Sequence, residues 1–172
     1  ACASVILLYG FALLYAATGE LSYAGLGAKA GAAYLQNPLL ILAGSGMVIS
    51  GIGFKLSLVP FHMWTPDVYQ GAPTPVTGYL ATVSKGAVFV ALTRMYLDGQ
   101  LYQYPSLIDA LVVIAIASML IGNLLALQQN NIKRLLAYSS IAHLGYLLVV
   151  LIALTGKGLA SDAVTYYLTA YV

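Results

Sequence analysis

The sequence predicts an all-α polytopic membrane protein, a helical bundle that contains a transmembrane helix broken by proline. Of the 172 residues, 61% are hydrophobic and only 7% are charged, whereas soluble domains carry roughly 25% charged residues. The mean hydropathy is +0.90. This number of polar side chains is too small to cover the surface of a water-soluble globule. The lipid bilayer is therefore the expected environment, and the whole chain is expected to form a single transmembrane domain. Four prolines gather in the stretch VPFHMWTPDVYQGAPTP, which predicts the break.

Six apolar stretches set the expected helices, since a full span needs about 20 apolar residues. Gly19 to Asn37 is a polar connection in which a short interfacial helix could form. Pro38 is a favourable first residue for the helix that follows it. The chain has no N-terminal methionine and ends within an apolar run at Val172, so a piece of a longer protein is expected. The predicted helices cover residues 1–17, 38–59 with a half-helix at 62–70, 76–97, 107–127, 132–154 and 163–172.

Pro60 and Pro66 decide how deep Lys55 lies. If the helix ends near residue 59, Lys55 can extend its ammonium to the membrane surface. If the chain breaks at Pro60 and a half-helix continues across the bilayer, Lys55 lies near mid-depth. Broken helices are tolerated where they line protein or a water-filled cavity, and they mark ion sites in transporters. His62 and Asp67 flank the break and are candidates for gating it or capping it, with capping favoured.

Lys85 and His143 are the other candidates for proton chemistry. Lys85 lies near the centre of its apolar stretch, where a charged side chain costs about 2.5–3.5 kcal/mol on insertion scales. A buried amine favours its neutral form, so Lys85 could gain and lose a proton; the alternative is a permanently charged lysine paired with a structural carboxylate. His143 lies halfway along the fifth stretch, near Ser139 and Ser140. It can relay protons through water or form a hydrogen bond between helices.

The remaining polar residues exclude several classes of function. Cys2 is the only cysteine, which excludes an internal disulfide and a cysteine-based metal site. The net charge of +2 gives no reason to expect nucleic-acid binding. No P-loop, dinucleotide fingerprint, HExxH or nucleophile elbow occurs, so neither a cofactor site nor a metal site is predicted. Asn123 is expected to form a hydrogen bond between helices, and Lys133 and Arg134 are expected to stay at the membrane surface.

Three separated motifs carry a resemblance to a known family. GIGFKLSLVPFHMWTPDVYQGAPTPV at 51–76, ATVSKGAVFVALTRMY at 81–96 and NNIKRLLAYSSIAHLGYLL at 130–148 resemble the antiporter-like membrane subunits of respiratory complex I, the proton-pumping NADH:quinone oxidoreductase. The resemblance covers essentially the whole chain. The wording Trp64-Thr65-Pro66-Asp67 is similar to subunit N, the homologue of mitochondrial subunit 2, rather than to the L and M types.

The resemblance implies an inverted-repeat fold with broken helices and a proton relay. Lys55 matches the lysine of the first broken helix, Lys85 matches the central lysine of the membrane axis, and His143 falls where polar residues continue that axis. It implies coupling of NADH-to-quinone electron transfer to proton pumping. NADH, FMN, iron–sulfur clusters, quinone and the acidic partners of the lysines are expected outside these residues.

The implied partners are other membrane and peripheral subunits in the inner (plasma) membrane of a bacterium, or alternatively in a plastid thylakoid membrane. Two other interpretations stay open. The chain could be a subunit of a multi-subunit cation/proton antiporter that uses the same lysines. It could also be a structural part of a membrane arm, with its lysines paired and inert.

Overall fold

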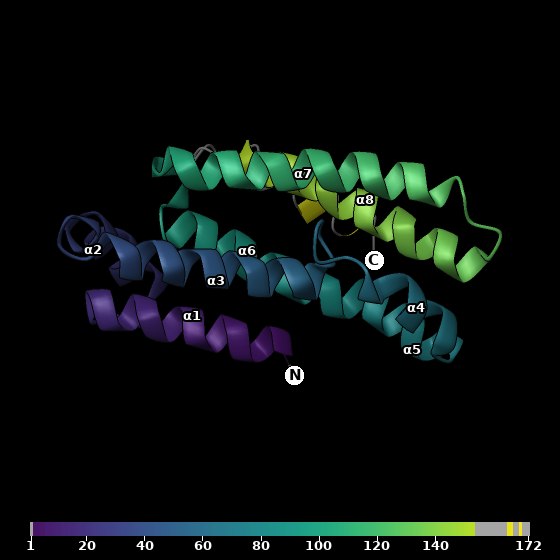
Figure 1. Cartoon of the computed structure of the whole chain (residues 1–172), viewed down its shortest axis with the longest axis horizontal. Coiled ribbons are helices and arrows are strands. Elements are labelled where there is room, and N and C mark those ends of the chain that lie inside the picture. The colour runs from purple at the N-terminus through teal and green to yellow at the C-terminus, as the bar shows by residue number, and fades with distance from the viewer. Residues whose placement is uncertain (1, 154–164, 167–168, 170–172) are drawn as a thin grey trace.

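The computed structural model describes residues 2–153, 165, 166 and 169, and every regular element in this part of the chain is helical (Figure 1). The predicted all-α fold is confirmed. The elements are α1 Cys2–Thr18, α2 Tyr23–Gln36, α3 Pro38–Leu56, α4 Trp64–Gly71, α5 Thr74–Tyr79, η1 Leu80–Ser84, α6 Lys85–Asp98, η2 Leu101–Gln103, α7 Pro105–Ala126 and α8 Ile132–Ile152.

Four helices of the described chain are long and apolar enough to cross a membrane. Three of them are α3, α7 and α8. The fourth is the continuous run Thr74–Asp98, which α5, η1 and α6 form together. The pair α1 and α2, bent by 60°, makes a fifth candidate if it counts as one span. These bounds lie within a few residues of the expected ranges. The sixth expected helix, 163–172, falls largely outside the described residues.

The broken helix differs in detail from the expectation. Its first half ends at Leu56 rather than Val59, because Ser57 adopts a left-handed conformation with φ of 61°. The amide of Leu58 then donates a 2.8 Å hydrogen bond back to the Gly53 carbonyl. The second half, α4, begins at Trp64 and ends at Gly71 instead of covering 62–70. Seven residues, 57–63, therefore separate the two halves.

The polar connection before α3 forms a helix of its own, α2. It begins after Gly19, whose φ of 70° turns the chain away from α1. Ser22 caps α2 by accepting a 3.1 Å hydrogen bond from the Gly25 amide, which is the usual role of serine at this position. The short helix considered possible in this connection is thus present.

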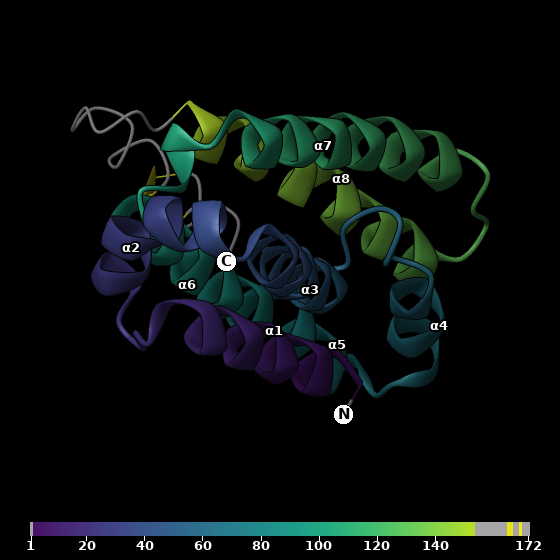
Figure 2. The same cartoon turned by 60° about the vertical axis from the view of Figure 1, so that its left-hand side comes forward.

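The helices are arranged with α3 and α6 between α1 on one side and the α7–α8 pair on the other (Figures 1 and 2). A core of buried aliphatic and aromatic residues joins α3, α6, α7 and α8. A smaller cluster, Val59, Tyr138 and Ile141, holds the broken segment against α8. The break is therefore packed into the bundle and is not a surface loop.

Small residues allow the paired helices to approach closely. A β-carbon added to Gly122 of α7 would lie 2.9 Å from the Ala142 amide nitrogen and 3.1 Å from the Tyr138 carbonyl oxygen of α8. Gly10 of α1 and Gly44 of α3 make a similar approach in the other pair. Close backbone contact of this kind supports helix association in lipid, where no hydrophobic driving force acts between helices.

We expect Gly122→Ala to destabilise the α7–α8 pair by about 1–3 kcal/mol, because the added methyl group meets backbone atoms that cannot move aside easily. Thermal unfolding of the full-length protein in detergent measures the effect as a lower Tm. Gly46→Ala is the matched control, since no described atom lies within 4 Å of the added carbon. Equal Tm values for the two variants would contradict the close packing.

Candidate functional site

Several polar groups around the helix break are hydrogen-bonded within the protein. The indole nitrogen of Trp64 donates to the Phe54 carbonyl at 3.0 Å, and the Thr65 hydroxyl donates to Ser57 at 2.6 Å. The Val59 amide donates to the Ser118 hydroxyl of α7 at 3.0 Å. Unsatisfied backbone groups are expensive in a membrane, so these bonds make the break a stable part of the fold.

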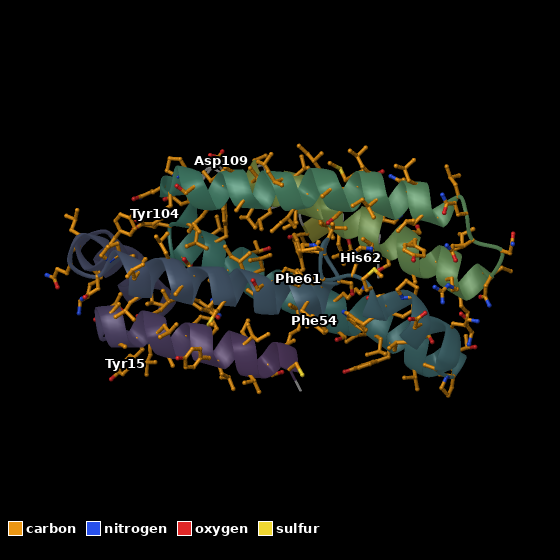
Figure 3. All side chains as sticks on the ribbon, in the orientation of Figure 1. Tyr15, Phe54, Phe61, His62, Tyr104 and Asp109 are labelled. Carbon is orange, nitrogen blue, oxygen red and sulfur yellow. The ribbon has the colours of Figure 1, made fainter. Side chains whose placement is uncertain are left out.

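The two prolines of the break have different surroundings. Pro60 is exposed in the connection between the two halves, and Pro66 is buried in the first turn of α4. A proline in the first turn costs no helical hydrogen bond, because its missing N–H would have no intrahelical partner there. Figure 3 shows Phe54, Phe61 and His62 gathered where α3 gives way to this connection.

Lys55 lies in the last turn of α3, just before the break. A cation is favourable there, because the end of a helix carries a partial negative charge. The side chain is exposed. The ion pairs of the described residues are Lys29–Glu20, Arg94–Asp98 and Arg134–Asp67, so none of them includes Lys55. Lys55 does not border the cavity that is lined by Ser140 and His143.

Lys85 is the buried cation of the described chain, with only 2% of its surface exposed. It directly follows η1, a turn of π-helix, and such turns are frequent at functional sites. Its ammonium donates to the Ser140 hydroxyl of α8 at 2.8 Å and lies 5.3 Å from the centre of the Tyr69 ring of α4. Within the part of the chain that the structure describes, no carboxylate pairs with it.

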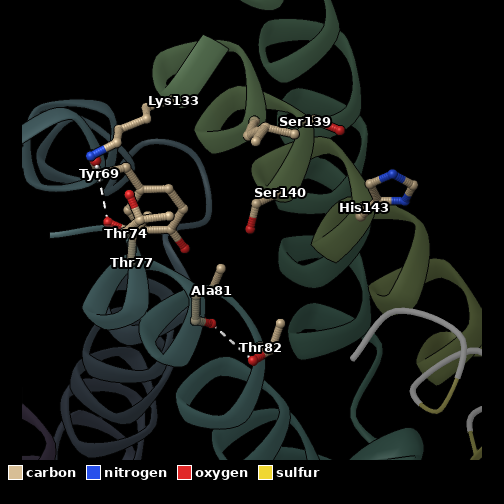
Figure 4. A pocket seen from close by; sticks show the side chains of 11 residues that line it. Tyr69, Thr74, Thr77, Ala81, Thr82, Lys133, Ser139, Ser140 and His143 are labelled. Carbon is tan, nitrogen blue, oxygen red and sulfur yellow. Dashed lines mark hydrogen bonds between the residues drawn. The ribbon is translucent and has the colours of Figure 1, made fainter. Parts of the chain in front are cut away.

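Ser140 also borders a cavity of about 580 Å³ between α8 and the α5–η1 segment (Figure 4). His143, one turn further along α8, borders the same cavity, and its ring packs edge-on against Tyr146 with 5.8 Å between ring centres. The structure therefore brings Lys85 and His143 to neighbouring parts of one region. The lining residues are Tyr69, Thr74, Thr77, Gly78, Ala81, Thr82, Lys133, Leu136, Ser139, Ser140 and His143.

His62 and Asp67 do not cap the half-helix as expected. The N-cap position of α4 belongs to Met63, and no side chain accepts a capping hydrogen bond there. His62 is buried in the connection, with 6% exposure. Asp67 lies in the first turn of α4, where its carboxylate accepts from the Arg134 guanidinium of α8 at 2.6 Å. Asp67 thus joins two helices.

Arg134 and its neighbour Lys133 hold α4 against α8. Arg134 also donates to the Gln70 side chain at 3.0 Å, and the Lys133 ammonium donates to the carbonyl of Ala72, at the C-terminus of α4, at 2.9 Å. We call these contacts the α4 clamp. The expectation that both cations stay at the membrane surface remains a prediction, and the structure adds that both bind α4. The expected interhelical bond of Asn123 is confirmed, since it donates to the Tyr146 hydroxyl of α8 at 3.0 Å.

Tyr69 and the π-helical turn are the features that sequence reasoning missed. The chain has fourteen tyrosines, and no spacing pattern singles out Tyr69. Its position against Lys85 depends on the turn at residues 72–73 that reverses the chain between α4 and α5. Its place in a half-helix flanked by prolines is the one feature of the sequence that could have drawn attention to it.

We expect Arg134→Ala to loosen α4 without unfolding the bundle, because the clamp is the polar link between α4 and α8. Hydrogen exchange of the backbone amides at 64–71 measures this as faster exchange. Arg94→Ala is the matched control, since it removes an exposed pair with Asp98 within α6. Unchanged exchange at 64–71 in Arg134→Ala would show that the clamp does not hold α4.

Comparison with known proteins identifies the family. The family model described as "NADH:quinone oxidoreductase/Mrp antiporter, TM" matches residues 1–172. A chain of respiratory complex I from Thermus thermophilus is 40% identical with a TM-score of 0.73, and 99% of this chain aligns with 35% of that chain. A chain of the archaeal membrane-bound sulfane sulfur reductase is 31% identical with a TM-score of 0.79, and 97% of this chain aligns with 34% of it.

A chain of the Mrp complex from Dietzia sp. DQ12-45-1b is 26% identical with a TM-score of 0.80, and 97% of this chain aligns with 30% of it. This chain therefore spans about a third of the length of each of these neighbours. The candidate membrane spans, the broken helix and the match over all 172 residues all support membership of one membrane-protein family. The chain belongs to the family of antiporter-like membrane subunits that occur in complex I, Mrp antiporters and the sulfane sulfur reductase complex.

Proposed function

We propose that this chain is part of a proton-translocating membrane subunit of NADH:quinone oxidoreductase, of the N type. The observation that carries the proposal is Lys85, a buried amine on a distorted transmembrane helix, bonded to a neutral hydroxyl and not to a carboxylate among the described residues. Ionisable residues inside a membrane are expensive and are generally functional. The 40% identity to the Thermus thermophilus complex I chain supports this particular assembly.

In the proposed relay Lys85 takes up and releases a proton. The lone pair of the neutral amine accepts the proton, and the resulting ammonium is stabilised by Ser140 and by the face of Tyr69. The adjoining cavity offers a route from Ser140 towards His143, which can donate and accept protons. Lys55 would serve as a second carrier at the broken helix, facing an acidic partner outside the described residues.

The break would gate this relay. Pro60 lies in the connection between the two halves, where His62 is buried, and Pro66 lies in the first turn of α4. Asp67 anchors this second half to α8. A movement of α4 would change the surroundings of Lys85, because Tyr69 belongs to α4. This arrangement gives neighbouring charges a means to favour uptake or release.

The proposed subunit contributes no redox centre. NADH, FMN, the iron–sulfur clusters and quinone would bind to other subunits, which are its proposed partners together with further membrane subunits. Electron transfer there would drive the charge movements that this chain converts into proton transport. The proposed location is the inner (plasma) membrane of a bacterium.

A cation/proton antiporter subunit is the second candidate. The Mrp neighbour gives a slightly higher TM-score, 0.80 against 0.73, although its identity is lower. Copurification of the full-length protein distinguishes the two functions. Recovery with peripheral redox subunits supports the complex I proposal, whereas recovery with membrane subunits alone, together with sodium-dependent proton exchange in vesicles, supports the antiporter.

We expect Lys85→Ala in the assembled complex to lower NADH-driven proton uptake into vesicles by about tenfold or more, because positioned proton carriers contribute at least this much. The ratio of proton uptake to NADH oxidation is the quantity to measure. Lys29→Ala is the control, since Lys29 forms an exposed pair with Glu20. Normal assembly with unchanged uptake in Lys85→Ala would refute a relay through Lys85.

A further inference from the structure

The surroundings of Lys85 include an aromatic face as well as a hydroxyl. Tyr69 is 1% exposed and Lys85 is 2% exposed. With the ammonium 5.3 Å from the ring centre, the distance lies within the range of about 6 Å over which a cation is attracted to an aromatic face. This attraction acts on the ammonium and not on the neutral amine, and it strengthens when water is excluded.

We propose that Tyr69 is a positioning residue whose ring sets how readily Lys85 keeps its proton. The inference rests on the proposed function, since it concerns the proton carrier of that relay. Ser140 can bond to the neutral amine as well as to the ammonium, because a hydroxyl both accepts and donates. The ring favours the ammonium alone, so it is the described neighbour that discriminates most clearly between the two forms.

The position of Tyr69 is fixed by contacts that α4, the helix that carries it, makes outside the site. Asp67 and Gln70 of the same helix bind Arg134, and Lys133 binds the carbonyl of Ala72 just after it. The Thr77 hydroxyl donates to the backbone carbonyl of Tyr69 itself at 3.3 Å. The ring therefore follows any displacement of α4, which is the second half of the broken helix. Tyr69 links the break to the proton affinity of Lys85.

Other titratable groups lie on the helices packed around Lys85. They are Lys55 on α3, Asp67 on α4, Tyr79 on α5, and Lys133, Arg134, Tyr138, His143 and Tyr146 on α8. A test of the ring must leave all of them unchanged. Replacement of Tyr69 by Phe and then by phenylalanines of increasing fluorine content meets this condition, because shape is nearly constant while the negative potential of the ring face falls step by step.

The measurement is the pH dependence of NADH-driven proton uptake by the complete complex in vesicles. We expect Tyr69→Phe to behave like the wild type, because the ring is retained. As fluorine content rises, and in Tyr69→Leu, the alkaline midpoint of uptake should move to lower pH by up to about one unit, a tenfold change in the protonation equilibrium. The direction follows because a less stabilised ammonium loses its proton at lower pH.

The outcomes separate this inference from the proposed function. Unchanged uptake in Lys85→Ala would refute the relay and with it the role of Tyr69. Loss of uptake in Lys85→Ala, with no shift across the fluorinated series, would overturn only the inference about the ring. A shift in Tyr69→Phe as large as that in Tyr69→Leu would also overturn it, because the hydroxyl would then be responsible. The fluorinated series decides the question even if Tyr69→Leu does not assemble.

Discussion

The hydrogen-bonded break between α3 and α4 is the constraint on which the rest of the site depends. In a bilayer the freed backbone groups have no water to bind, so the chain must supply partners. Trp64 donates to the Phe54 carbonyl and Ser118 accepts from the Val59 amide. These bonds fix where α4 begins. Because α4 carries both Asp67 and Tyr69, they also fix the position of the ion pair with α8 and of the ring beside Lys85.

Lys85 is a buried amine that pairs with no carboxylate among the described residues, and its surroundings do not strongly favour either the ammonium or the neutral amine. A close carboxylate would favour the ammonium strongly, and a fully apolar site would favour the neutral amine. A hydroxyl at 2.8 Å and an aromatic face at 5.3 Å lie between these extremes. Such surroundings suit the proposed role of Lys85, in which it both binds and releases a proton.

Much of the fold could be predicted from the sequence because membrane spans are set by local composition. The runs that became α7 and α8 lie within a few residues of their expected bounds, since their apolar length matches the bilayer. The end of α3 lies three residues before its expected position, because the left-handed Ser57 accepts a hydrogen bond from α4 and the nearby Val59 amide binds α7. The contacts of Lys133 and Arg134 with α4 could not be predicted, because no local signal shows that α4 folds back to meet them.

The sequence by itself determined that the chain is membrane-embedded, that one helix is broken by proline, and that Lys55 and Lys85 are unusual cations. These conclusions need only composition, span length and the position of prolines. The tertiary structure alone decided that Lys85 is buried beside Ser140 and Tyr69, whereas Lys55 is exposed in the described chain. The reason is that the surroundings of a side chain depend on which helices pack against it. Tyr69 and Lys85 meet only because the chain reverses between α4 and α5.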